Sequence, residues 1–94
     1  MNIRLVQFNL GPGNRAAAES VADKVVPLIR AQPGCESCEF FVDNGEGDYG
    51  LVVRWESQQA ADEAASVVSP VMMPALAAAH AQASIRLFDV YEPK

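Results

Sequence analysis

Two side chains in this sequence, each the single occurrence of its type, could carry chemistry: one as a general base and one as the wall of a dry cavity. His80 is the only histidine among the 94 residues, and histidine is the side chain whose unperturbed pKa lies nearest neutrality. Trp55 is the only tryptophan, and its ring can form the wall of a dry cavity. We therefore predict His80 and Trp55 as the catalytic residues, with His80 as general base.

Each of these residues also has a plainer interpretation. Trp55 can be a core aromatic residue that closes the end of a strand, because aromatic side chains dominate cores and binding clefts alike. His80 can be a solvated residue in the last turn of a helix, where the helix dipole favours a cation. The sequence leaves both alternatives open.

Apolar and aromatic side chains near Trp55 and His80 are predicted to enclose the substrate. Methionine fills irregular gaps adaptably. If a general base deprotonates the substrate, the resulting anion needs a hydrogen-bond donor in the same cavity to stabilise it. The predicted substrate-binding residues are Phe8, Tyr49, Leu51, Met72, Met73 and Leu76.

Cys35 and Cys38 have redox-motif spacing but run into a strand, whereas a reactive thiol of that kind needs a helix N-terminus to lower its pKa. Side chains at i and i+3 of a strand are expected on opposite faces, so we predict two free thiols. Two cysteines and one histidine do not complete a zinc ligand set. No metal and no cofactor are predicted.

The residue pattern predicts one domain, 1–94, of the α+β class. Strand-like runs and a turn-rich segment between them form a central β-hairpin, and each side adds an Ala-rich helix and an outer strand. The result is a ferredoxin-like β-α-β-β-α-β fold, a four-stranded antiparallel sheet with strand order four-one-three-two and helices on one face. The predicted strands are 3–10, 33–42, 49–56 and 84–91, and the predicted helices are 15–31 and 58–68, with a further piece after Ser69.

The helices carry specific start and break signals. Asn14 and Ser57 are predicted N-caps, and Pro27 is predicted to kink the first helix or to cause a local 3₁₀ turn. Ser69-Pro70 looks like a second cap, which predicts a second helix broken in two, with Pro74 in the first turn of the second piece. That piece would place Met72, Leu76 and His80 on one face and act as a lid over a cavity beneath the break.

Apolar residues on both sheet faces predict a homodimer, because the face without helices would otherwise be exposed. The residues assigned to that face are Val6, Phe8, Val52, Phe88 and Val90, so Phe8 is counted there as well as in the cavity. Arg4, Arg54 and Arg86 are placed on the same face. They are expected to bind an anion or to pair with carboxylates, for which the candidates are Glu39, Glu56 and Asp43.

Composition excludes several partners. The net charge is −5, which provides no basic surface for nucleic acid or an anionic membrane. No apolar run approaches the roughly 20 residues of a membrane span, and the first residues lead into strand alternation rather than a signal peptide. We expect a cytoplasmic protein.

The chain resembles the antibiotic biosynthesis monooxygenase family of dimeric α+β barrels. The residues that carry the resemblance are Pro33-Gly34-Cys35, Arg54-Trp55-Glu56 and Ser69-Pro70, and it extends over nearly the whole chain in element order. It implies the fold and a dimer, and it implies an activity within a group that includes cofactor-independent oxygenases of phenols or quinols, haem-degrading enzymes and processors of small metabolites.

Two positions depart from that family. The oxygenases have an Asn four residues before the strand-three Trp, where this chain has Leu51, and many members have a His after the Ser-Pro pair, where it has Val71. His80 lies too far along to match the haem-ligating position, so haem degradation is not implied. The leading hypothesis is an oxidoreductase, a cofactor-independent monooxygenase acting on a small aromatic or quinol-type metabolite. The alternative is a non-catalytic or non-oxidative dimer of the same fold that binds a metabolite or acts in stress.

Overall fold

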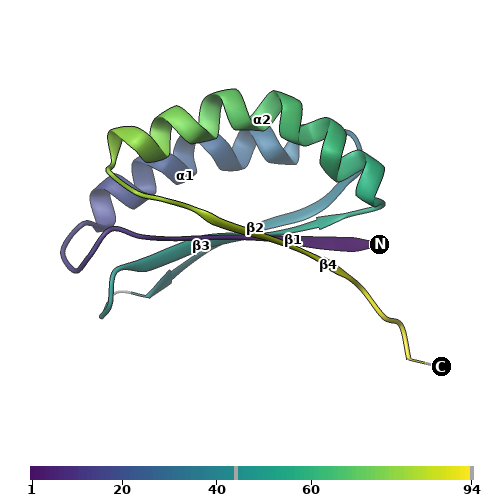
Figure 1. Ribbon diagram of the computed structural model, residues 1–94, viewed down its shortest axis with the longest axis horizontal. Coiled ribbons are helices and arrows are strands. Elements are labelled where there is room, and N and C mark those ends of the chain that lie inside the picture. The colour runs from purple at the N-terminus through teal and green to yellow at the C-terminus, as the bar shows by residue number, and fades with distance from the viewer. Residues whose placement is uncertain (44, 94) are drawn as a thin grey trace.

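The computed structural model describes residues 1–43 and 45–93, and shows two helices on one face of a four-stranded antiparallel sheet (Figure 1). The strand order is β2-β3-β1-β4. This confirms the predicted ferredoxin-like element order and strand order. The elements are β1 (Asn2–Asn9), α1 (Arg15–Arg30), β2 (Cys35–Asp43), β3 (Asp48–Trp55), α2 (Gln58–Ala78) and β4 (Ser84–Asp89).

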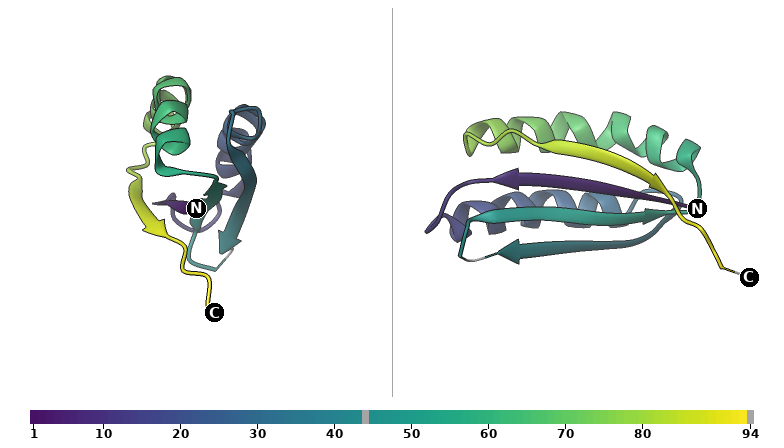
Figure 2. Two further views of the ribbon diagram at one scale, coloured as in Figure 1. Left: turned by 90° about the vertical axis from the view of Figure 1, so that its right-hand side faces the viewer. Right: turned by 60° about the horizontal axis from the view of Figure 1, so that its bottom comes forward.

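Each helix covers its own part of the sheet. Seen from the end, α1 lies on the β2 side and α2 on the β4 side (Figure 2). α1 packs against β2, and α2 reaches β1 and β3. β4 is an edge strand whose residues are all exposed.

Strand pairing determines which side chains face the helices, because directly opposed residues share a face. The inward residues of β3 are all buried: Tyr49, Leu51, Val53 and Trp55. Val6 pairs with Leu51 and Phe8 with Tyr49, and both β1 side chains are at most 4% exposed. Their predicted place on the uncovered face was wrong. β1 is apolar on both faces, so its alternation did not identify the covered one.

The face without helices still carries apolar side chains. Leu5 pairs with Val52, and Ile3 with Phe88, so Val52 and Phe88 lie on this face as predicted. Phe41, opposite Gly50, also belongs to it. We call this set, Ile3, Leu5, Phe41, Val52 and Phe88, the outer apolar face. Val90 lies beyond the end of β4.

The three arginines do not share a face. Arg54 and Arg86 lie on the outer side, since they pair with Ile3 and Leu5, but Arg4 alternates with these and faces the helices. Arg54 lies 3.9 Å from Glu36 and 3.7 Å from Glu92, instead of the predicted carboxylates. The Arg86 guanidinium lies 4.7 Å from the centre of the Phe88 ring.

Both helices run unbroken through their prolines. α1 is α-helical through Pro27, and α2 is one helix of 21 residues that includes Pro70 and Pro74, so the predicted 3₁₀ turn, break and lid were wrong. All three prolines are exposed. The carbonyl groups that they leave unpaired can therefore bond water, and a solvent-side defect lets a helix curve over its sheet, as α2 does in Figure 1.

Of the two predicted N-caps, one is confirmed and the other is wrong. Ser57 caps α2, because its Oγ accepts a hydrogen bond from the Ala60 N–H at 3.1 Å. Asn14 precedes α1 without a side-chain cap; its Nδ2 donates to the Leu10 carbonyl at 2.6 Å instead. None of the described helices has the length and apolar character needed to cross a bilayer.

Candidate functional site

A cavity of ≈ 110 Å³ lies between α2 and the sheet. Most of its lining is aliphatic, with Trp55 of β3 at one side and Met72 of α2 at another. Ile85 of β4 also lines it and is 48% exposed, which places the opening on the β4 side. The predicted cavity against Trp55 therefore exists, although α2 is not broken above it.

Small side chains on α2 cause this cavity. The buried residues of the helix begin with three alanines and continue with larger side chains: Ala60, Ala61, Ala64, Val68, Met72 and Leu76. The alanines cannot reach the sheet at the spacing that the larger residues set, so space remains beneath the first turns. The α2 side of the cavity extends from Ala61 to Met72, and neither Pro70 nor Pro74 is among its lining residues.

Arg4 enters the cavity from β1. Its Nη2 lies 3.2 Å from Asp62 Oδ1, and its Nη1 donates to the Ala61 carbonyl at 3.3 Å. Its Nε is buried and has no hydrogen-bond partner among the described residues. Two contacts to α2 thus hold the guanidinium in place, and Nε–H, one of its five N–H donors, stays buried without a partner in the described part of the chain.

Trp55 provides a second unused donor. The side chain is 3% exposed, and its Nε1 is likewise buried with no partner in the described part of the chain. A buried donor without a partner costs about 1–3 kcal/mol. Both side chains line the cavity, so two buried donors without partners in the described part of the chain lie in its wall.

The structure brings together only part of the predicted site. Trp55 and Met72 line the cavity. Phe8 and Tyr49 instead form an aromatic cluster with Phe40, with ring centroids 6.0–6.3 Å apart. Leu51 and Leu76 are fully buried core residues, and Met73 is 47% exposed. None of these five residues lines the cavity, so the prediction that they share it with Trp55 and Met72 is not supported.

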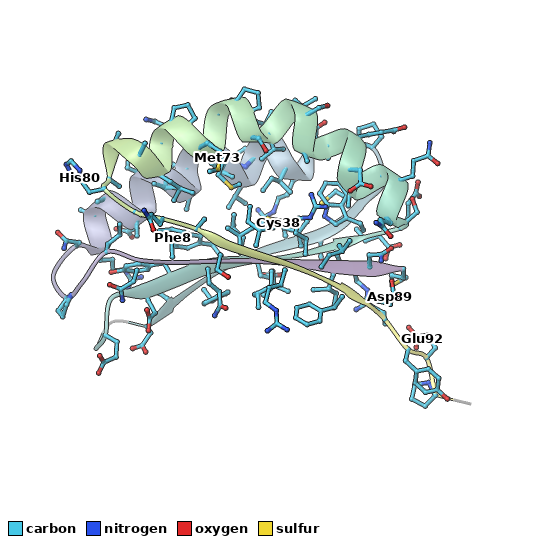
Figure 3. The ribbon with its side chains drawn as sticks, in the orientation of Figure 1. Phe8, Cys38, Met73, His80, Asp89 and Glu92 are labelled. Carbon is cyan, nitrogen blue, oxygen red and sulfur yellow. The ribbon has the colours of Figure 1, made fainter. Side chains whose placement is uncertain are left out.

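His80 lies at the other end of the molecule from Trp55. Trp55 pairs with Asn2, which also pairs with Asp89, and Figure 3 shows Asp89 and His80 at opposite ends of the sheet. His80 follows the end of α2 and is exposed, so it does not share the helix face of Met72 and Leu76. The structure therefore does not bring the predicted base to the cavity.

The local geometry gives His80 a backbone role. Its φ is 59°, its N–H donates to the Ala77 carbonyl at 3.0 Å, and the Ala81 N–H donates to Leu76 O at 2.9 Å. This is the bonding pattern of a Schellman motif, in which a left-handed residue ends a helix. Histidine terminates α2 at a position that glycine usually occupies.

Cys35 and Cys38 are free thiols, as predicted, but they do not point to opposite faces. A β-bulge at Glu36 pairs Cys35 with Trp55 and Cys38 with Val53, both inward residues. The extra residue shifts the alternation by one. Burial raises the pKa of the Cys38 thiol to about 11 and also raises the pKa of Cys35. Both thiols are therefore protonated and weakly reactive at neutral pH.

Sequence reasoning missed Arg4 and the alanine stripe as parts of the site. The stripe had a signal, since Ala61, Ala64 and Ala65 are grouped at the start of the second helix. Arg4 had none, because its partner Asp62 is 58 residues away. Among the described residues, no group of three or more His, Cys, Asp or Glu side chains is placed to hold a metal ion.

Comparison with solved structures supports the fold. A protein of Deinococcus radiodurans assigned to the antibiotic biosynthesis monooxygenases superposes with a TM-score of 0.82 at 16% identity, over 100% of this chain and 96% of that one. SnoaB, a cofactor-independent oxygenase from Streptomyces nogalater, gives 0.72 at 19% identity over 98% and 95%. MhuD, as a variant with two manganese protoporphyrin IX bound per active site, gives 0.69 at 20% over 100% and 98%.

The sequence itself determines the family. A search of curated proteins gave no match. The family model for antibiotic biosynthesis monooxygenase, however, matches residues 1–69, from β1 into the second half of α2. That segment contains Arg4, Trp55 and the alanine stripe. The chain belongs to the antibiotic biosynthesis monooxygenase family.

Proposed function

We propose that this protein is a cofactor-independent monooxygenase that oxidises a one-ring phenol or quinol in the Trp55 cavity. The observation that carries the proposal is the pair of unpartnered buried donors, Trp55 Nε1 and Arg4 Nε, on that cavity. A phenolate oxygen is negatively charged and can accept hydrogen bonds from these two donors. The family and the fold of SnoaB support the reaction class.

The cavity volume limits the substrate. An engineered cavity of about 150 Å³ in another protein binds benzene, and the cavity here is ≈ 110 Å³. One ring fits if part of it projects through the opening beside Ile85, whereas a polyaromatic skeleton does not. We therefore expect a substrate with one ring.

The reaction needs only the substrate, dioxygen and a site that stabilises the anion. The phenolate passes one electron to dioxygen, the two radicals couple at a ring carbon, and the hydroperoxide loses water. Overall the substrate loses two hydrogen atoms, one oxygen atom becomes a ring carbonyl, and the other leaves as water with those hydrogens. Trp55 and Arg4 would hold the phenolate oxygen and lower the pKa of the bound phenol.

Haem does not fit this site. His80, the only histidine in the sequence, lies beyond the far end of α2 and not on the cavity. The cavity is also smaller than one benzene-sized void, so a porphyrin would have to displace α2. The porphyrin bound to MhuD is therefore not part of the function proposed here.

Oxygen uptake tests the function. With purified protein and no added cofactor, we expect uptake with one-ring phenols or quinols and little with three-ring analogues. Product formed under ¹⁸O₂ should contain one labelled oxygen. His80→Gly should keep this activity, because glycine suits the left-handed φ at that position. Saturable quenching of Trp55 without any uptake would favour the alternative, a metabolite-binding protein of the same fold, and would contradict the oxygenase.

We also propose that the protein is a homodimer through its outer apolar face. Five apolar side chains lie there under no helix, with Arg54 and Arg86 among them, and such a face is usually covered in solution. Sedimentation should show twice the 10.1 kDa of the chain. Val52→Glu should shift the species toward monomer, because pairing would bury the new charge. A folded wild-type protein that sediments only as monomer at micromolar concentration would contradict this.

A further inference from the structure

We infer that Arg4 makes the Trp55 cavity selective for the ionised form of its ligand, so that the ligand is an acidic phenol or enol bound as its anion. The inference rests on the function proposed above and specifies the charge state of the substrate. It assigns to Arg4 a role in specificity that is separate from the role of Trp55. Three features of the structure carry it.

The first feature is the fixed orientation of the guanidinium. Asp62 Oδ1 and the Ala61 carbonyl, both on α2, engage Nη2 and Nη1. An arginine side chain loses much rotamer freedom when it is ordered, and these contacts order it before any ligand arrives. The Nε–H is then left buried and unpaired.

The second feature is unequal screening of the charge. The Arg4 side chain is 19% exposed, whereas its partner Asp62 is 59% exposed. Asp62 is therefore largely solvated, while Nε lies where the effective dielectric constant is lower. At equal distance, solvent would screen a ligand anion in the cavity from Arg4 less than it screens the exposed carboxylate.

The third feature is that the cavity lining, in the described part of the chain, contains no carboxylate that would compete with a ligand for Arg4. Its paired neighbours on the sheet are Val53 and Leu87, and α1 contributes Ile29 to the cavity. Arg4 forms an ion pair with Asp62, and Asp89, one inward position along the sheet, accepts a hydrogen bond from Asn2 at 2.7 Å. The lining itself contains no carboxylate among the described residues.

Two probes with the same ring distinguish the effect of ligand charge on binding from the effect of ligand shape. 4-Nitrophenol ionises near neutral pH, and 4-nitroanisole has the same ring but cannot ionise. Binding of each is measured by quenching of Trp55, the only tryptophan, at several pH values across the titration of free nitrophenol. For the wild type we expect nitrophenol affinity to rise with pH and to level off once the free probe is fully ionised. Nitroanisole affinity should not change over that range.

The sign of this dependence follows from the pKa of the bound probe. Arg4 favours the anion, so the bound pKa lies below the free pKa, and affinity increases between the two values. A lowering by one pKa unit corresponds to a tenfold preference for the anion. In Arg4→Met the bound anion loses its partner in an apolar site, so affinity should fall as pH rises.

Matched variants separate this effect from general damage. Arg4→Met should reduce the affinity for nitrophenolate at least tenfold and leave nitroanisole binding nearly unchanged. Lys24→Met, which removes one positive charge from the exposed surface of α1, should behave as wild type. Arg4→Lys keeps the positive charge but removes the Nε–H group, so it should give an intermediate loss of affinity for nitrophenolate. Asp62→Asn should strengthen anion binding. Circular dichroism confirms that each variant is folded.

The outcomes distinguish the two proposals. If nitroanisole binds equally to wild type and Arg4→Met and both show the same pH profile for nitrophenol, the cavity exists but the role of Arg4 is refuted. If neither probe quenches Trp55 in the wild type, the cavity binds no aromatic ring, and the proposed function is refuted together with this inference. If Arg4→Met fails to fold, the comparison of wild type with Arg4→Lys and Asp62→Asn decides the question.

Discussion

Replacement of Leu76 by Trp is expected to lower the free energy of unfolding by about 3 kcal/mol, whereas Ala65→Phe should change it by less than about 1 kcal/mol. Both substitutions place a large ring on the inner side of α2. Leu76 is 1% exposed and does not line the cavity, so a larger ring there displaces packed neighbours. Ala65 is half-buried and lines the cavity, so the added ring can occupy existing space.

Thermal and urea unfolding followed by circular dichroism measure this difference. For a domain of this length, 1 kcal/mol corresponds to a change in melting temperature of roughly 4–8 °C. Leu76→Trp should therefore melt at least about 8 °C below Ala65→Phe. The Ala65→Phe protein should also lose saturable quenching of Trp55 by nitroanisole, since its own ring fills the site. If Leu76→Trp is tolerated and Ala65→Phe unfolds, the cavity lies under the second half of α2 instead.

The strand and turn chemistry in the sequence was sufficient to predict the fold. The hairpin strands carry β-branched and aromatic residues at alternating positions, and the segment between them is rich in Gly, Asp and Asn. Two Ala-rich segments with helical periodicity then form the helices that cover one face of such a sheet. Ser57 was correctly identified as a cap because its side chain acts on the adjacent turn. Local rules of this kind do not depend on distant contacts.

Which face of β1 is covered could not be read from its alternation. Ile3 and Leu5 are apolar, and so are Val6 and Phe8, because the strand has one side under the helices and one that we propose to be under a second subunit. The two-residue period is the same for either choice. The wrong choice placed Arg4 on the outside and so concealed it from the predicted site.

The proline break had a signal that argued against it. Pro70 and Pro74 are four residues apart and share one helix face, and Val68, Met72 and Leu76 lie on the opposite one. Prolines on the solvent side are tolerated because water can satisfy the freed carbonyl groups. The apolar stripe thus continues past Pro70, as the buried residues of α2 show. A proline ends a helix most effectively where it also interrupts packing.

The bulge at Glu36 and the unpaired donors had no local signal. The bulge depends on how β2 pairs with β3 at Trp55 and Arg54, which alternation within β2 does not specify. The Nε of Arg4 is unpaired because Asp62 and Ala61 take the other nitrogens. Such a donor is recognised only by accounting for every buried polar atom in three dimensions.

Trp55→Phe is expected to reduce oxygenase turnover by about 100-fold while leaving the free energy of unfolding nearly unchanged. The loss of turnover follows because one of the two donors to the phenolate oxygen is removed, and loss of a single donor to a developing oxyanion typically lowers kcat by about 10²–10³. Stability changes little because two effects oppose each other. The smaller ring leaves a void, but the variant no longer buries an unpaired N–H, which costs about 1–3 kcal/mol.

The comparison of Trp55→Phe with Trp55→Ala tests this argument. Trp55→Ala removes the donor and also most of a buried aromatic side chain, so it should lower the unfolding free energy by about 3–5 kcal/mol. If Trp55 were only a core residue, Trp55→Phe would retain full turnover and would lose stability in proportion to the atoms removed. A Trp55→Phe protein that is as stable as wild type but nearly inactive would show that a donor left unpaired in the empty protein is used by the substrate. Urea unfolding and oxygen uptake on the same preparation provide both measurements.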